Sequence, residues 1–305
     1  MKNDVFITGT SCYFPNKPVS NEDMEDFLGL ITGKHSRVKP VILKQNGIKQ
    51  RYYALTKEQK ITHTNAEMAV NSILQLLKNS DISNSEIELL SCATSSPDQM
   101  LPSHASMVHG LLKNKPLEIF SASGICLSCL QAFKTAFWGV LSGEKRNAIC
   151  STSELTSATL LSKNYDIEYE KCADLGVQPY MALEKDFLRF MLSDGASAVL
   201  LQNNPGNGKA LHVEWVEMTS YANELPTCMY MGAERKENGE LKSWKSFNNL
   251  ERTEQSLFVV KQDVKLLGAH AVPYWAKHIK YCLEKHNVAP ESISYVLPHV
   301  SSMFF

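Results

Sequence analysis

The sequence predicts an α/β protein made of two similar halves. Its 305 residues are enough for about two domains. Hydrophobic residues make up 44% of the chain and charged residues 21%, the balance of a folded globular protein rather than a disordered one. An amphipathic helix, a polar turn and a short apolar strand follow one another twice, in residues 65–96 and in residues 271–302. Because these three elements form half of a βαβ unit, the two copies predict a duplicated α/β fold with parallel strands buried on both faces.

The first copy defines its elements clearly. Its helix carries an apolar stripe at helical spacing, formed by Ala66, Ala69, Val70, Ile73 and Leu77. A strand is expected to follow at Ile87–Ala93, and the second copy predicts the matching strand at Ile293–Leu297. The alternative, that two windows of this length resemble each other by chance, stays open.

A turn-rich segment, Gln202–Lys209 (QNNPGNGK), divides the chain. It follows the apolar run Ala196–Leu201, which we interpret as a buried strand. We therefore predict an N-terminal half over residues 1–208 and a C-terminal half over residues 209–305. A long segment separates the first copy from this boundary, whereas only Met303–Phe305 follow the second copy, so the second half is expected to be incomplete in this sequence.

The composition argues against several classes of protein. Lys and Arg total 31 and Asp and Glu total 32, so the net charge of −1 does not favour a nucleic-acid partner. No run of 18 apolar residues is present, so no membrane-spanning helix is expected. The amino terminus, MKNDVFITGT, lacks the apolar run of a signal peptide, and the eight cysteines are scattered along the chain. These features predict a cytoplasmic protein with reduced thiols.

The segment Ile119–Phe133 (IFSASGICLSCLQAF) is the best candidate for chemistry. It begins like a strand, turns through small residues, and continues as an apolar helix for which Gly143 is a suitable end. Cys126 is thus expected at the first turn of a buried helix. The partial positive charge and the backbone N–H groups of a helix N-terminus stabilise a thiolate, and also an oxyanion formed on an attached thioester.

Two other interpretations of Cys126 stay open at this point. Cysteine is most often a small buried hydrophobic residue. Cys126 and Cys129 also form a CxxC pair, which allows a thiol-redox role. No second pair is present to complete a zinc site, so no metal is expected.

The tract FSASGICLSCLQAF resembles the nucleophile segment of the ketoacyl-acyl-carrier-protein synthase III group of the thiolase superfamily. Five further stretches resemble that family in the same order along the chain, namely VFITGTSCYFPNKPVSNEDME, GIKQRYYA, ATSSPDQMLP, LSDGASAVL and LPHVSS. The resemblance implies the thiolase fold, with layers in the order α-β-α-β-α. The stretches LGLITGK and NGIKQRYYAL further resemble ketosynthases of dialkylresorcinol and flexirubin-type pigment pathways.

The resemblance also implies a reaction. Cys126 would accept an acyl group as a thioester, and a Claisen-type condensation would then form a carbon–carbon bond in fatty-acid or polyketide biosynthesis. His299 would stabilise the enolate by donating an N–H. This chemistry needs no cofactor. Leu101 matches a residue that reaches into the acyl pocket of a neighbouring subunit, so the resemblance implies a homodimer.

The substrate contacts are less complete than in the family. Arg51 remains as a binding residue for the thioester donor, but Val41 and Gln45 replace a Trp and an Arg that grip coenzyme A, so acyl-carrier-protein thioesters are favoured over coenzyme A thioesters. Lys39, Lys44 and Lys49 are candidates for contact with an acidic carrier protein; a solvated charged face is the alternative.

The end of the sequence departs most from the family. Ser302 stands where the family has Asn, in a segment that binds substrate, and no position carries the catalytic Asn that lies further downstream in the family. An alternative function is therefore a non-catalytic ketosynthase-like partner or chain-length factor, and this form is expected to be inactive if the missing elements are essential.

Overall fold

A computed structural model describes residues 3–174 and 186–299 of the chain. Its contacts divide the protein into two units that interleave along the sequence. The first unit comprises residues 1–19, 51–158 and 193–216, and the second comprises residues 20–50, 159–192 and 217–305. The sequence predicts two repeated halves that meet after residue 208. The two compact units do not show whether the halves are repeats of each other, so the duplication stays a prediction.

The first unit contains the larger sheet and the helices that cover it. Its elements are β1 (Phe6–Tyr13), α3 (Asn65–Lys78), η2 (Asn84–Glu86), β4 (Leu89–Ala93), α4 (His104–Leu112), β5 (Glu118–Ala122), η3 (Ile125–Leu127), α5 (Ser128–Leu141), β6 (Asn147–Glu154), β7 (Gly195–Gln202) and β8 (Leu211–His212). The short elements β2 (Val19–Ser20), β3 (Gln50–Arg51) and η4 (Ser157–Leu160) lie where the chain passes from one unit to the other.

The described part of the second unit contains more helix than strand. Its elements are α1 (Met24–Leu28), η1 (Ile31–Gly33), α2 (Lys39–Asn46), η5 (Ser162–Asn164), α6 (Asp166–Asp174), β9 (Met229–Tyr230), β10 (Ala233–Arg235), β11 (Leu241–Ser243), η6 (Trp244–Ser246), α8 (Asn249–Glu254), β12 (Lys261–Gln262), α9 (Val264–Lys285) and η7 (Pro290–Ser292).

The six strands of the sheet follow the order β5-β4-β6-β7-β1-β8. β4 is parallel to β5 and β6, as the sequence predicts, but β7 is antiparallel to both β6 and β1. The expected parallel pairing is therefore confirmed for β4, β5 and β6 and does not extend to β7. The physical reason lies in the register: Gly195, the first residue of β7, pairs with Glu154, the last residue of β6, so β7 starts at the edge where β6 ends and runs back.

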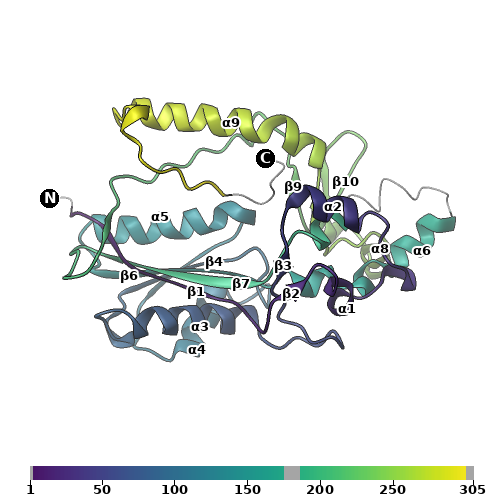
Figure 1. Ribbon diagram of the computed structural model, residues 1–305, viewed down its shortest axis with the longest axis horizontal. Helices are drawn as coiled ribbons and strands as arrows, with labels where there is room; N and C mark the ends of the chain where they lie inside the picture. The colour runs from purple at the N-terminus through teal and green to yellow at the C-terminus, as the bar shows by residue number, and fades with distance from the viewer. Residues whose placement is uncertain (1–2, 175–185, 300–305) are drawn as a thin grey trace. The chain divides into compact units, whose positions relative to one another are not determined.

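The sheet is covered on both faces. α3 and α4 lie on one face and α5 on the other (Figure 1). All five residues of β4 are buried, and they alternate between the two cores: Leu90 and Cys92 pack with α3 and α4, whereas Leu89 and Ala93 pack with α5. This alternation is the two-residue period of a strand, and burial on both faces explains why β4 is apolar except for Ser91, whose hydroxyl donates a hydrogen bond to the Ala132 carbonyl.

The predicted helix at residues 66–77 and the predicted strand at residues 87–93 are confirmed as α3 and β4. α3 begins with a capping box. The Thr64 hydroxyl accepts a hydrogen bond from the Glu67 backbone N–H at 3.2 Å, and the Glu67 carboxylate accepts one from the Thr64 N–H at 2.8 Å. Two backbone donors that a helix N-terminus leaves without intrahelical partners are thereby satisfied.

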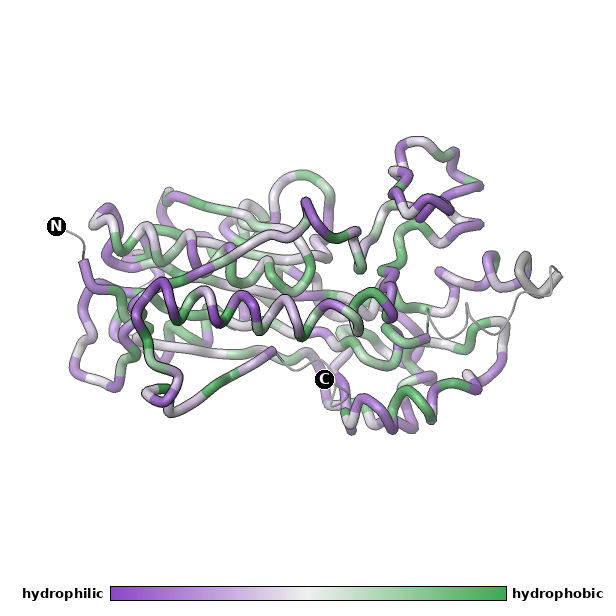
Figure 2. Tube along the Cα trace, turned by 90° about the horizontal axis from the view of Figure 1, so that it is seen from above, coloured by the Kyte–Doolittle hydropathy of each residue, from purple (hydrophilic) through white to green (hydrophobic). Residues whose placement is uncertain are grey.

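The second copy of the repeat forms its helix but not its strand. α9 presents hydrophilic and hydrophobic residues in alternation along its length (Figure 2). Its apolar side borders a groove of about 1000 Å³ lined by residues that include Trp275, Ile279 and Leu283. The strand expected at Ile293–Leu297 is wrong, because these residues have no strand assignment and Leu297 is 93% exposed. A strand needs a neighbour for its backbone hydrogen bonds, and residues 293–297 pair with none in the described chain.

None of the helices within residues 3–174 and 186–299 is both long enough and apolar enough to cross a bilayer.

Candidate active site

Cys126 lies on a strained turn between β5 and α5. After β5 ends at Ala122, Gly124 has φ 143° and Ile125 has φ 48°. Positive φ is costly for a β-branched residue such as Ile125, since its Cβ crowds the backbone. Such strain persists only where the surrounding structure holds it, and it is concentrated at functional sites.

The cysteine side chain is exposed in its unit. It lies in η3, the short helix that directly precedes α5, so the sequence placed it correctly at the head of a helix. Gly143, with φ 84°, follows the C-cap residue of α5, as expected for a helix end. The interpretation of Cys126 as a small buried hydrophobic residue is wrong for this structure, because the thiol is presented outside the core of its unit.

Cys129 has a different environment. It is half-buried, and its thiol donates a hydrogen bond to the backbone carbonyl of Cys126, with Sγ 3.1 Å from the oxygen. Burial raises the pKa of the Cys129 thiol, so the thiol form is favoured over the thiolate. A resolving cysteine must react as a thiolate. The environment of Cys129 therefore does not favour the redox interpretation of the CxxC pair.

The carboxyl ends of the three parallel strands β4, β5 and β6 meet at the edge that carries this turn. In open α/β sheets, binding sites form outside this edge. Thr94, directly after β4, donates its backbone N–H to the carbonyl of Ala122 at the end of β5, with 3.2 Å between N and O. Glu154, the last residue of β6, lies at the same edge and accepts hydrogen bonds from three consecutive residues that follow β4.

Sequence reasoning missed Glu154. A signal was present, since an acidic residue that ends a largely buried strand is unusual and marks the edge where sites form. Burial raises the pKa of the Glu154 carboxyl, although hydrogen bonds from Ser96, Ser95 and Thr94 oppose the shift. The same carboxylate contributes to the raised pKa of Cys129 after the larger effect of burial.

His104, at the start of α4, was also missed. It is 3% exposed, and its Nε2 lies 3.1 Å from the Ser153 hydroxyl. Burial lowers the pKa of His104 to about 4, so the ring is neutral at physiological pH.

The predicted site residues fall in different places. Leu101 belongs to the first unit and is 85% exposed in the loop before α4, while His299 belongs to the second unit and is exposed. Arg51 is only 1% exposed, and burial lowers its pKa. This burial favours a packing role for Arg51, and its contact with substrate stays a prediction. Ser302 lies outside the described residues.

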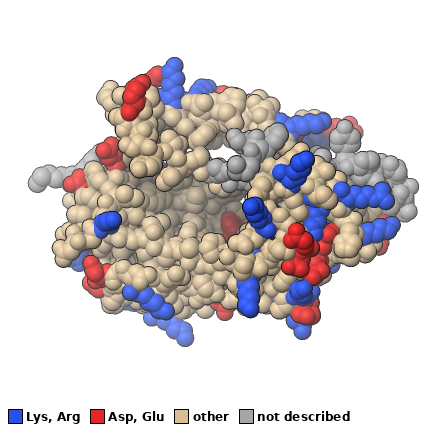
Figure 3. Space-filling view, in the orientation of Figure 1, with Lys and Arg blue, Asp and Glu red and all other residues tan. Residues whose placement is uncertain are grey.

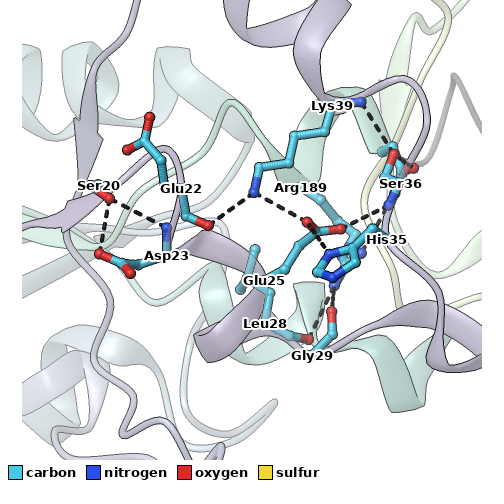
Figure 4. Close-up of polar contacts among 11 residues, drawn as sticks. Ser20, Glu22, Asp23, Glu25, Leu28, Gly29, His35, Ser36, Lys39 and Arg189 are labelled. Carbon is cyan, nitrogen blue, oxygen red and sulfur yellow. Dashed lines mark hydrogen bonds and ion pairs between the residues drawn. The ribbon is translucent and has the colours of Figure 1, made fainter.

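The second unit has a polar cluster around Glu25, shown in Figure 4. The Glu25 side chain is 6% exposed and receives hydrogen bonds from the Ser36 N–H at 2.9 Å and from Lys39 Nζ and His35 Nδ1, both at 3.1 Å. Arg189 donates to the carbonyls of Leu28 and Gly29 at the end of α1.

This cluster bears on the three lysines that were expected to contact an acidic carrier protein. Lys44 and Lys49 are exposed, as docking to a carrier protein would need, but the ammonium of Lys39 is paired with Glu25. Figure 3 shows Lys, Arg, Asp and Glu side chains interspersed over the region of α1 and α2. Among the residues whose side chains are described, no group of three or more His, Cys, Asp or Glu is arranged to hold a metal ion.

Sequence comparison finds relatives named beta-ketoacyl-acyl-carrier-protein synthase III. The protein of Clostridium acetobutylicum is 28% identical over 206 residues, which are 68% of this chain and 53% of that protein. The protein of Rhodobacter capsulatus is 23% identical over 298 residues, 97% of this chain and 77% of that protein. The first match thus spans about half the length of the relative. No protein-family model matches the chain.

Solved structures share the fold. AbyA1, a tetronic acid condensing enzyme, superposes with a TM-score of 0.68 at 18% identity, covering 96% of this chain and 77% of its own. A 3-oxoacyl-(acyl-carrier-protein) synthase III superposes with a TM-score of 0.63 at 15% identity, covering 99% of this chain and 80% of its own. The predicted α/β class with the thiolase-like fold is confirmed. The solved structures thus show the fold of the chain, and the sequence relatives carry the name of the family that its motifs resemble.

Proposed function

We propose that the protein is an acyltransferase that forms a carbon–carbon bond by Claisen-type condensation of acyl thioesters, through an acyl-cysteine on Cys126. The observation that carries this proposal is the place of Cys126: an exposed thiol on a strained turn, at the head of α5 and at the carboxyl edge of the sheet. The relatives named synthase III support the same reaction class.

The first half-reaction loads the cysteine. The Cys126 thiolate attacks the carbonyl carbon of an acyl thioester, and the carbonyl electrons move to oxygen. Backbone N–H groups at the start of α5 are the oxyanion donors in this proposal. The intermediate collapses by breaking the bond to the donor's sulfur, and the released thiolate takes up the proton that Cys126 lost. One thioester is exchanged for another, so the step is close to thermoneutral.

The second half-reaction forms the new bond. Loss of carbon dioxide from a second, malonyl-type thioester leaves an enolate, whose carbon attacks the acyl carbonyl on Cys126. The carbon–sulfur bond to Cys126 then breaks, and the thiolate is regenerated. We assign His299 to the enolate oxygen as an N–H donor. This is the role that the family resemblance implies for His299.

The partners in this proposal are acyl-carrier-protein or coenzyme A thioesters and a second copy of the chain. The exposed Lys44 and Lys49 support docking of an acidic carrier protein. β5 supports the homodimer: it forms one edge of the six-stranded sheet, and its Phe120 is 39% exposed. An edge strand with an apolar exposed side chain is a template for pairing with another chain.

Intact-mass measurement tests the proposal. The protein is incubated with octanoyl-acyl-carrier protein or octanoyl-coenzyme A, and the mass of one octanoyl group is expected on the wild-type chain. Cys126→Ala is expected to abolish the adduct and Cys129→Ala, three residues away, to retain it. Absence of an adduct from the wild type, or its survival in Cys126→Ala, would overturn the proposed function.

His299→Ala separates the two half-reactions. We expect the variant to form the octanoyl adduct but to lose condensation with malonyl-acyl-carrier protein. A wild-type chain that takes the acyl group but makes no condensed product would instead favour the non-catalytic, ketosynthase-like partner.

A further inference from the structure

A clamp of hydrogen bonds joins the ends of β4 and β6. One oxygen of Glu154, Oε1, accepts the Ser95 backbone N–H at 2.7 Å. The other, Oε2, accepts the Ser96 hydroxyl at 2.5 Å and the Thr94 hydroxyl at 3.3 Å. The Ser96 oxygen in turn accepts the N–H of Leu155, the residue after Glu154, at 2.8 Å. The segment after β4 therefore donates hydrogen bonds to the end of β6, and the segment after β6 donates one in return.

The same loop is also fixed to α3. Asn65, which is 0% exposed, donates its amide to the Thr94 hydroxyl and to the Ser96 carbonyl, both at 2.7 Å. The Asp98 carboxylate accepts the backbone N–H groups of Asn65 and Ala66 at 2.7 and 2.9 Å. Residues 94–98 are thus held by a strand end on one side and a helix N-terminus on the other, which leaves little freedom at the base of the loop.

This loop leads to two parts of the proposed site. It continues directly to Leu101, the predicted wall of the acyl pocket. At its start, the Thr94 N–H bonds to Ala122, four residues before Cys126 along the chain. A displacement of the loop base would move Leu101 and loosen the turn that carries the nucleophile.

We propose that Glu154 is a positioning residue for acyl-chain selection: its carboxylate fixes the base of the loop that carries Leu101. This inference rests on the proposed function. A carboxylate suits the task because both oxygens only accept hydrogen bonds, and all three neighbours are donors. A glutamine of the same size would keep one acceptor and direct an amide N–H group towards a donor, so at least one hydrogen bond would be lost.

The test compares acyl lengths. The rate of acyl-Cys126 formation is measured by mass spectrometry with hexanoyl- and dodecanoyl-coenzyme A, and the ratio of the two rates is the readout. We expect Glu154→Gln and Leu101→Ala each to change this ratio at least fivefold, while Glu240→Gln leaves it within twofold. Glu240 is an exposed carboxylate that pairs with Lys236 in the second unit, so it is a matched substitution outside the loop.

A double-mutant cycle separates positioning from general damage. If Glu154 acts through Leu101, its substitution should have little further effect on the ratio once Leu101 is Ala. Ser96→Ala removes two hydrogen bonds of the clamp, the one donated to Glu154 and the one accepted from Leu155, and retains the carboxylate. It should therefore shift the ratio in the same direction, and it serves if Glu154→Gln fails to fold.

Additive effects in the cycle, or adducts whose length ratio is unchanged in both clamp variants, would overturn the role of Glu154 alone. Absence of any adduct from the wild type would overturn the proposed function. The two failures are therefore distinguishable.

Discussion

The backbone of two residues decides how Cys126 is presented. Gly124 and Ile125 both have positive φ, and together they turn the chain from the end of β5 into the head of α5. Glycine adopts such a conformation readily because it has no Cβ, whereas isoleucine does not. The exposure of the thiol is thus produced by local backbone geometry at the junction of a strand and a helix.

Gly124→Ala should strain this turn. A Cβ at Gly124 meets no atom within 4 Å, so the penalty comes from φ 143° alone, and we expect a loss of about 1–3 kcal/mol in the free energy of unfolding. The rate at which iodoacetamide alkylates Cys126 should also change, because the turn that presents the thiol is strained. Gly110→Ala is the control: Gly110 also has open space around it but lies within α4, where alanine is the better helix former. Urea unfolding of both variants measures the difference, and equal effects would contradict the argument.

His104 should make stability depend on pH. Its pKa is about 4 in the folded protein and about 6.5 when unfolded, so the unfolded chain binds more protons between these values. The contribution of neutral His104 is complete above pH 6.5 and declines as the pH falls towards 4, by about 3 kcal/mol in all.

Urea unfolding across this range should therefore show a shallower decline in His104→Gln than in the wild type. His109→Gln, a substitution on the same helix, is the control. A decline of the same slope in all three proteins would show that burial of His104 is not its cause.

At the scale of elements, buried polar side chains stabilise short helices that would not be stable in isolation. α1 has five residues, too few for a stable isolated helix, and its last carbonyls are capped by Arg189. Glu25, on the same helix, fastens the segment that leads into α2 through Ser36 and Lys39. The arrangement of α1 and α2 therefore depends on a few charged contacts.

Glu25→Gln should destabilise the protein by about 3 kcal/mol, since breaking a buried ion pair leaves Lys39 without its counter-charge. Burial by itself would raise the pKa of Glu25, but hydrogen bonds from Ser36, His35 and Lys39 outweigh it and lower the pKa from 4.5. The stabilisation is present above pH 4.5 and is lost as the pH falls further. Thermal unfolding at pH 7 measures the effect, with the neighbouring exposed Glu22→Gln as control. A loss of the same size in both variants would contradict the assignment.

At the scale of the whole molecule, the sheet of the first unit ends in two different edges. β5 has five residues and exposes Phe120, whereas β8 at the opposite edge has two residues. Longer edge strands with apolar side chains favour pairing, and a charge placed on them opposes it. The proposed homodimer is therefore expected to use β5 and not β8.

Phe120→Lys should shift the protein towards the monomer in sedimentation velocity, by at least tenfold in the dissociation constant. Leu211→Lys places the same charge on β8, where Leu211 is 69% exposed, and should leave the dimer intact. Dissociation by the second variant alone, or a wild type that is monomeric at micromolar concentration, would contradict the proposed interface.

Elements with local signals could be predicted from the sequence. The apolar stripe of α3, the buried run of β4 and the small-residue turn before Cys126 are each encoded by residues close together in the chain, so periodicity and turn chemistry were sufficient to predict them. The family resemblance rested on the same short segments.

Features that depend on residues distant in sequence became visible in the folded chain. The antiparallel course of β7 follows from its register with β6, and the lack of a strand at residues 293–297 follows from the lack of a pairing neighbour in the described chain. The roles of Glu154 and His104 come from partners that β4, β6 and α4 bring together. Strand pairing, burial and hydrogen bonding between distant segments have no local sequence signature, because their free energy arises only when the chain has folded.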